Sequence, residues 1–97
     1  MEVNRAIKTK DEITKSWRER GFSCDLWVDP PGQVWEDYQH DIDELIYVLE
    51  GVLELEVSGK RTTLHKGDEA FIPACSNHSV RNMGGCEARW LYGYHSR

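Results

Sequence analysis

Cysteine is scarce in this 97-residue chain, where three copies stand far apart at Cys24, Cys75 and Cys86. Their number is odd, and no two of them have the close spacing that is typical of zinc-binding or redox pairs. A disulfide framework and a cysteine zinc site are therefore disfavoured. This cysteine usage is typical of a reducing compartment, and we expect a cytoplasmic protein.

Long apolar runs are also absent. No stretch approaches the roughly 20 apolar residues that a membrane-spanning helix needs. The first residues, MEVNRAIKTKDE, lack the apolar segment of a secretion signal. The sequence therefore predicts neither a leader nor a membrane partner.

Basic residues are few in the middle of the chain. Residues 21–60 hold one basic and ten acidic residues, a net charge of −9, against −5 for the whole chain. Such a surface repels phosphate backbones, so we expect no nucleic-acid partner. The acidic block suits a bound cation, or it is simply solvated surface.

A short helix is predicted near residues 10–20. Thr9 and Glu12 have the spacing of a capping box, in which each side chain satisfies a backbone N–H of the first turn. Ile13 and Trp17 are four residues apart and would share one helix face. We therefore expect this helix to pack by that edge against a larger body.

Beyond residue 21 the apolar pattern has a period of two, which is typical of strands. The expected strands are 22–28, 33–38, 44–49, 53–57, 61–64, 70–72, 79–82 and 88–94. Turn residues separate them, so the pattern predicts an all-β sandwich, jelly roll or barrel. We expect residues 1–20 to form an N-terminal segment with the helix, and residues 21–97 to form a single β domain.

A histidine and a glutamate stand four positions apart at His40 and Glu44. In an extended strand they would face the same side, together with Tyr38. Tyr47 would then lie on the opposite side, which suits solvent or an interface. If residues 41–43 turn instead, this argument weakens.

Unpaired polar groups on an apolar face are costly, and a divalent metal ion removes that cost. One further histidine would complete the two-histidine, one-carboxylate set that is favoured by non-haem iron chemistry. His78 is a candidate, although it lies 38 positions after His40. The alternative is a metal-free polar cluster.

Two spaced motifs carry a resemblance to a known family. The first runs through Gly32, Tyr38-Gln39-His40, Glu44 and Gly51, and the second through Gly67, Pro73-Ala74-Cys75, His78 and Asn82. In every spacer the chain resembles the small single-domain cupins. Two residues depart from the family pattern, since Tyr38 replaces its first histidine and Cys75 replaces a glycine.

The resemblance implies a cupin-type antiparallel β-barrel, or jelly roll, with one short N-terminal helix. It implies that His40, Glu44 and His78 hold one divalent metal ion, which would be iron, manganese, nickel, copper or zinc. Tyr38 at the fourth ligand position would fill space or hydrogen-bond beside the metal. It also implies a homodimer, which suits a core this small.

Two functions follow from the resemblance. The first is a metal-dependent enzyme, such as a dioxygenase, acting on a small organic molecule, with Trp35 and Trp90 as pocket walls and Tyr38 or Tyr47 as a hydrogen-bond donor. The second is a non-catalytic barrel that binds or senses a small ligand, with or without metal. Trp35 and Trp90 also suit a core or a dimer interface. Arg81 and Arg89 would either anchor an anionic substrate or pair with the acidic strands.

Overall fold

The computed structural model describes residues 8–96. One helix and eight strands follow one another in it. They are α1 (Lys10–Glu19), β1 (Asp25–Asp29), β2 (Val34–Gln39), β3 (Glu44–Glu50), β4 (Leu53–Val57), β5 (Lys60–Leu64), β6 (Glu69–Ile72), β7 (Asn77–Asn82) and β8 (Ala88–Tyr94).

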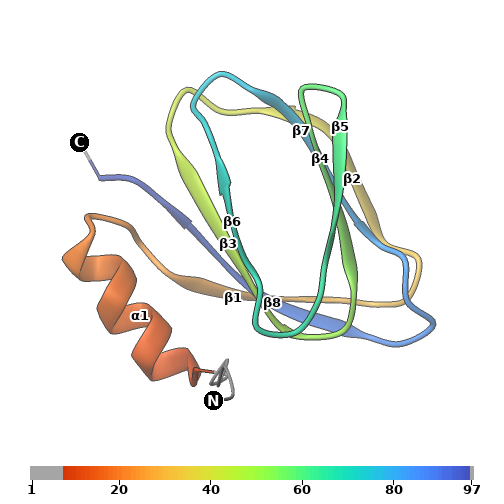
Figure 1. Cartoon of the computed structure of the whole chain (residues 1–97), viewed down its shortest axis with the longest axis horizontal. Helices are drawn as coiled ribbons and strands as arrows, with labels where there is room; N and C mark the ends of the chain where they lie inside the picture. Colours follow the sequence, from red (N-terminus) through yellow and green to blue (C-terminus); the bar gives the residue numbers. More distant parts are fainter. Residues whose placement is uncertain (1–7, 97) are drawn as a thin grey trace, which may run out of the picture.

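The strands form two four-stranded sheets that face each other (Figure 1). The first sheet has the order β1-β8-β3-β6 and the second has the order β2-β7-β4-β5. Every strand pair is antiparallel. The expected jelly roll is confirmed, although the two sheets do not close into one continuous hydrogen-bonded barrel.

The first strand is shorter than its alternating pattern predicted. Phe22 makes only an isolated bridge to His95, and regular pairing begins where Asp25 meets Tyr92. Between them, Ser23 N donates to Tyr94 O and Tyr94 N donates to the Ser23 hydroxyl, each at 3.0 Å. A side chain at Gly93 would collide with the backbone of Ser23, so the two segments lie in close contact here.

The predicted helix and its cap are confirmed. The Thr9 hydroxyl accepts a hydrogen bond from Glu12 N, and the Glu12 carboxylate accepts one from Thr9 N. Ile13 and Trp17 are buried in a cluster with residues of β3 and β8. Figure 1 shows the helix beside the first sheet, on the side away from the second sheet. The Trp17 indole donates to Glu69 Oε1 at 3.0 Å, which ties the helix to the edge strand β6.

The main apolar core lies between the two sheets. Its buried residues are Ile46, Val48, Leu53, Leu55, Leu64, Ile72, Val80, Ala88 and Trp90. A second cluster lies under α1 and includes Leu45, Tyr47 and Leu91. Successive side chains of β3 therefore point alternately into the core between the sheets and into the cluster under α1, and both faces of this strand are covered.

Within residues 8–96, the one helix spans ten residues. No helix in this part of the chain is long and apolar enough to cross a bilayer.

Candidate metal centre and pocket

His40 and Glu44 come from two different sheets. Strand β2 of the second sheet ends at Gln39, the chain bends at residues 41–42, and β3 of the first sheet begins at Glu44. The turn alternative for residues 41–43 is thus confirmed, and an extended strand through residues 40–44 is wrong. The bend, not strand parity, turns both side chains inward.

Backbone hydrogen bonds hold this bend. Cys75 N donates to His40 O at 2.6 Å, and Ala74 N donates to the Asp43 carboxylate at 2.7 Å. Cys75 has a positive φ of 65°, so it adopts the conformation that glycine would have at this motif position. The loop before β7 therefore holds the backbone of His40 in place through its carbonyl group.

The structure brings the three predicted ligands together. Glu44 Oε1 lies 3.9 Å from His40 Nε2 and 3.5 Å from His78 Nε2. One ligand atom from each residue lies within 4.8 Å of the other two. His78 reaches the group from β7, which pairs with β2 so that His78 stands opposite Tyr38.

Burial changes the protonation of two members of the group. Glu44 and His78 are both buried. Desolvation raises the pKa of the Glu44 carboxyl from 4.5 to about 7. Desolvation also lowers the pKa of His78, helped by the neighbouring His40 and opposed by a backbone hydrogen bond at Ser76. Without a cation, burial thus favours the neutral forms of Glu44 and His78.

The donor set fits a divalent metal ion. Glu44 Oε1 is buried and, among residues 8–96, is the one buried side-chain polar atom without a hydrogen-bond partner. Such an atom costs free energy unless something binds it, and a cation between the carboxylate and two imidazoles does so. His78 Nδ1 lies 3.3 Å from Ser76 O. With the proton on Nδ1, the lone pair of Nε2 faces Glu44.

The group lies in the wall of a pocket of about 220 Å³ between the two sheets. The remaining lining is mostly aromatic and consists of Trp27, Trp35, Tyr38, Val80, Trp90, Tyr92 and Tyr94. Burial and the nearby Glu44 raise the pKa of Tyr94 to about 12, so its hydroxyl is a donor at neutral pH. The pocket combines one polar group with a broad apolar surface.

A β-bulge turns both Trp35 and Tyr38 toward the pocket. Trp35 pairs with Val80 and Tyr38 pairs with His78, so β2 has one extra residue in this stretch. Asp37 takes a positive φ of 58° and its backbone N–H donates to the Ser79 hydroxyl at 2.9 Å. The Tyr38 ring then lies beside both histidines, 6.3 Å from His40 and 6.4 Å from His78 between ring centroids.

The other predicted pocket residues divide into two groups. Trp35 and Trp90 both line the pocket. Tyr47 does not: it is buried under α1, where its hydroxyl accepts a hydrogen bond from Lys8 N. This corrects the expectations that Tyr47 borders the site or faces solvent, because the helix covers the outer face of β3.

One buried carboxylate was missed by the sequence interpretation. Asp29 precedes two prolines and reads as the end of a strand, yet only 1% of it is exposed and three indoles donate to it. The available signal was indirect. Buried tryptophans need an acceptor for their N–H groups, and the chain is rich in tryptophan.

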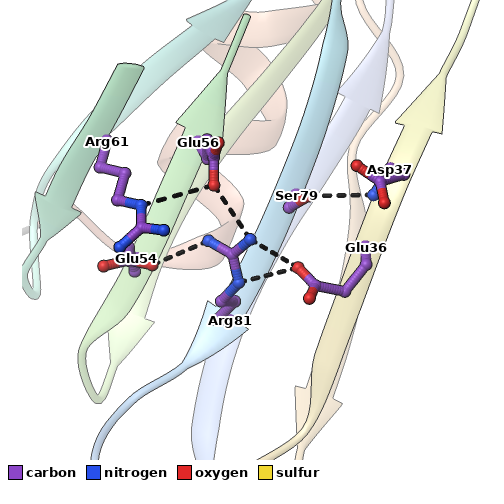
Figure 2. A network of polar contacts seen from close by, with 7 residues as sticks. All are labelled: Glu36, Asp37, Glu54, Glu56, Arg61, Ser79 and Arg81. Carbon is purple, nitrogen blue, oxygen red and sulfur yellow. Dashed lines mark hydrogen bonds and ion pairs between the residues drawn. The ribbon is translucent and has the colours of Figure 1, made fainter. Parts of the chain in front are cut away.

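Arg81 and Arg89 pair with acidic residues and do not line the pocket. Figure 2 shows Arg81 on the outer face of the second sheet, where its guanidinium binds Glu36, Glu54 and Glu56 at 2.6 to 2.9 Å. Ser79 and Asp37 lie beside this network. Part of the acidic block is therefore paired with Arg81 on the outer face, and these glutamates do not line the pocket.

Known proteins are similar to this chain in sequence. A family model described as a cupin domain matches residues 25–94. Polyketide synthase CurC of Streptomyces cyaneus is 33% identical over 72 residues, which cover 74% of this chain and 47% of that protein. Tetracenomycin polyketide synthase protein TcmJ of Streptomyces glaucescens is 28% identical over 88 residues, which cover 91% and 57%.

A solved structure with a similar sequence identity to this chain has a similar fold. The TT1209 protein from Thermus thermophilus is 32% identical and has a TM-score of 0.72, with 78% of this chain and 73% of that chain covered. The chain spans about half the length of the two curated relatives.

Proposed function

This chain belongs to the family of cupin domains, and from that premise we propose that it binds one divalent metal ion through His40, Glu44 and His78. We further propose that it acts there on a small organic molecule held in the aromatic pocket. The observation that carries the proposal is Glu44 Oε1, which is buried without a hydrogen-bond partner between two imidazole nitrogens. A cation held by these three residues would satisfy this oxygen and favour the ionised carboxylate.

A metal bound there would supply a Lewis acid or a redox centre with positions left open for a ligand. The chain's own residues supply the rest. The aromatic rings of the pocket exclude water and orient an apolar ligand, and Tyr94 holds its proton at neutral pH as a hydrogen-bond donor. Tyr38 lies beside the two histidines and is 42% exposed, so it borders the route by which a ligand enters.

The ligand class draws support from the relatives. CurC and TcmJ are both named for polyketide synthases. No lysine or arginine is among the residues that line the pocket, which suits an uncharged carbon skeleton better than a phosphorylated or polyanionic one. We therefore place a polyketide-derived small molecule first among the ligands, with dioxygenase-like chemistry as the reaction to screen.

A non-catalytic binding barrel is the second candidate, and Tyr38 is the observation that favours it. A tyrosine where the family pattern has a histidine leaves three protein ligands, which weakens metal binding without closing the pocket. The two functions differ in turnover. Oxygen uptake by the iron-loaded protein with oxygen-bearing aromatic compounds supports the enzyme, whereas tight binding without uptake or product supports the binding barrel.

The metal site is tested by elemental analysis. We expect near one equivalent of metal in the wild type, purified without chelators and reconstituted with Fe(II), Mn(II) or Zn(II). His78→Ala and Glu44→Ala should lose the metal and stay folded by circular dichroism. His65→Ala is the matched control, because His65 is exposed outside the pocket, and it should keep the metal. Stoichiometric metal in both ligand variants would overturn the assignment.

A further inference from the structure

Three tryptophans donate to one buried carboxylate at the end of β1. Asp29 Oδ1 accepts the indole N–H of Trp27 at 2.6 Å and that of Trp35 at 3.1 Å. Asp29 Oδ2 accepts the indole N–H of Trp90 at 3.0 Å. The three rings come from β1, β2 and β8, so this carboxylate joins both sheets.

Hydrogen bonds from the Asn82 side chain hold the backbone next to this carboxylate in place. The Asn82 side-chain amide is buried and donates to Pro30 O at 3.0 Å and to Cys86 O at 2.9 Å. The same amide donates a longer hydrogen bond to Asp29 O at 3.4 Å. Burying a carboxylate is costly, and here neutral indoles supply the compensating hydrogen bonds. Asp29 is thus placed by its neighbours and in turn fixes three aromatic side chains.

The hydrogen bonds to Asp29 change what the pocket offers to a ligand. All three indole N–H groups are engaged by the carboxylate, so the tryptophans offer ring carbon to the pocket and no free donor. Ring contacts connect this apolar region to the histidines through Tyr92 and Tyr94 on one side and Tyr38 on the other. The pocket therefore has a polar end and an aromatic end.

We propose that Asp29 is a positioning residue that fixes Trp27, Trp35 and Trp90 so that this end of the pocket accepts a flat aromatic ring. This role of Asp29 rests on the proposed function for the orientation of the ligand. The oxygen substituents of the ligand would face His40, Glu44 and His78, and its aromatic ring would lie against the tryptophans. Fixed aromatic walls favour a planar π-system over a saturated skeleton of similar size, because stacked and edge-to-face contacts add to apolar burial.

The test compares two probes on metal-free protein. These are 2-naphthol and decahydro-2-naphthol, which share one carbon skeleton and one hydroxyl but differ in flatness. Titration calorimetry should show the wild type preferring 2-naphthol by about tenfold, the scale of one good aromatic contact. Asp29→Asn should lose most of this preference, since an amide NH₂ in place of one carboxylate oxygen meets an indole N–H donor to donor.

Two further readouts separate positioning from a purely structural role. Asp29→Asn should keep its far-ultraviolet circular dichroism while its near-ultraviolet tryptophan bands weaken. A merely destabilised protein would bind both probes less in equal proportion. The double variant D29N/W90F removes the Trp90 indole that conflicts with the amide, and it should recover part of the preference relative to Asp29→Asn alone.

Trp27→Phe provides the test if Asp29→Asn does not fold. Trp27 is 40% exposed on an edge strand, so the fold tolerates its loss, while the phenyl ring lacks the N–H that anchors it. Its preference for 2-naphthol should also fall. The proposal is overturned if the wild type binds both probes equally, or if folded Asp29→Asn or folded Trp27→Phe keeps the full preference.

The outcome is independent of the metal assignment. Asp29→Asn should bind as much metal as the wild type, because within residues 8–96 the Asp29 carboxylate accepts its hydrogen bonds from the three indoles and not from His40 or His78. A protein that prefers 2-naphthol but binds no metal would refute the proposed metal function alone. One that binds metal but shows no preference would refute the role of Asp29 alone.

Discussion

At the scale of single residues, Glu44 is the clearest case of chemistry created by burial. In the unfolded chain its carboxyl has an ordinary pKa of 4.5, and in the folded chain the pKa is about 7. Between these values the folded protein holds a proton that the unfolded protein releases. The contribution of this proton to stability is complete below pH 4.5 and is lost as the pH rises through 7.

Glu44→Gln should therefore remove a pH dependence. The metal-free wild type should lose up to about 3 kcal/mol of unfolding free energy between about pH 4.5 and 8, relative to Glu44→Gln. His78 is present in both proteins, so the opposite effect of its lowered pKa largely cancels in the comparison. Urea unfolding at several pH values measures the difference. Parallel curves for the two proteins would contradict the assignment.

Tyr38 is the residue at which this chain leaves the family pattern. Because its ring lies beside both histidines, Tyr38→His should add a metal ligand and tighten metal binding by about tenfold or more, the scale of a ligand's supporting interactions. Tyr38→Phe keeps the ring and should leave the affinity unchanged. Competition with a metal-sensitive dye measures both. An equal affinity in Tyr38→His and Tyr38→Phe would place residue 38 outside the ligand shell.

At the scale of elements, the bulge in β2 decides which side chains reach the pocket. Trp35 and Tyr38 have opposite parity in the sequence, and a regular strand would send them to opposite faces. The extra residue at Asp37 reverses the parity, so both side chains line the pocket. Simple alternation could not have predicted this, because the bulge depends on pairing with β7.

Two substitutions at Asp37 should separate the effect of backbone conformation from that of charge. The positive φ of this residue suits glycine and penalises a β-branched side chain. Asp37→Val should cost about 1–3 kcal/mol of unfolding free energy, whereas Asp37→Gly should cost little. Urea unfolding measures both, and an equal loss in both variants would show that the Asp37 side chain, not the backbone, stabilises the bulge.

At the scale of the whole molecule, α1 is part of the core. Trp17 is fully buried against β3 and β8, and the outer face of β3 would expose Leu45 and Tyr47 without the helix. Because α1 covers this face, β3 can carry apolar side chains on both sides, while Glu44 on its inner side lines the pocket. Residues 8–20 therefore support the site, although none of them lines the pocket or belongs to the metal group.

Trp17→Ala should destabilise the protein by about 3–5 kcal/mol, through lost apolar burial and the cavity that remains. The pocket should survive in the fraction that stays folded, because Trp17 does not line it. Chemical unfolding measures the loss, and metal analysis of the folded protein at low temperature supplies the control. A loss below about 1 kcal/mol would show that the helix adds little to the core.

The sequence alone determined the features that depend on local order and spacing. The helix cap, most strand positions and an all-β sandwich, jelly roll or barrel followed from capping chemistry and from apolar alternation, since these depend on residues close together in the chain. The resemblance to cupins then implied the jelly roll among these three. The motif spacing singled out His40, Glu44 and His78 through resemblance to cupins. Departures at Tyr38 and Cys75 were visible in the same way.

Only the tertiary structure decided what depends on contacts between distant segments. The bend between the two sheets places His40 beside Glu44, and the pairing of β7 with β2 delivers His78. Tyr47 packs under α1 and therefore does not line the pocket. Asp29 acquires its role because three strands bring their indoles to it, an arrangement with no local signature. Burial, which shifts the pKa of Glu44, exists only once the sheets have packed.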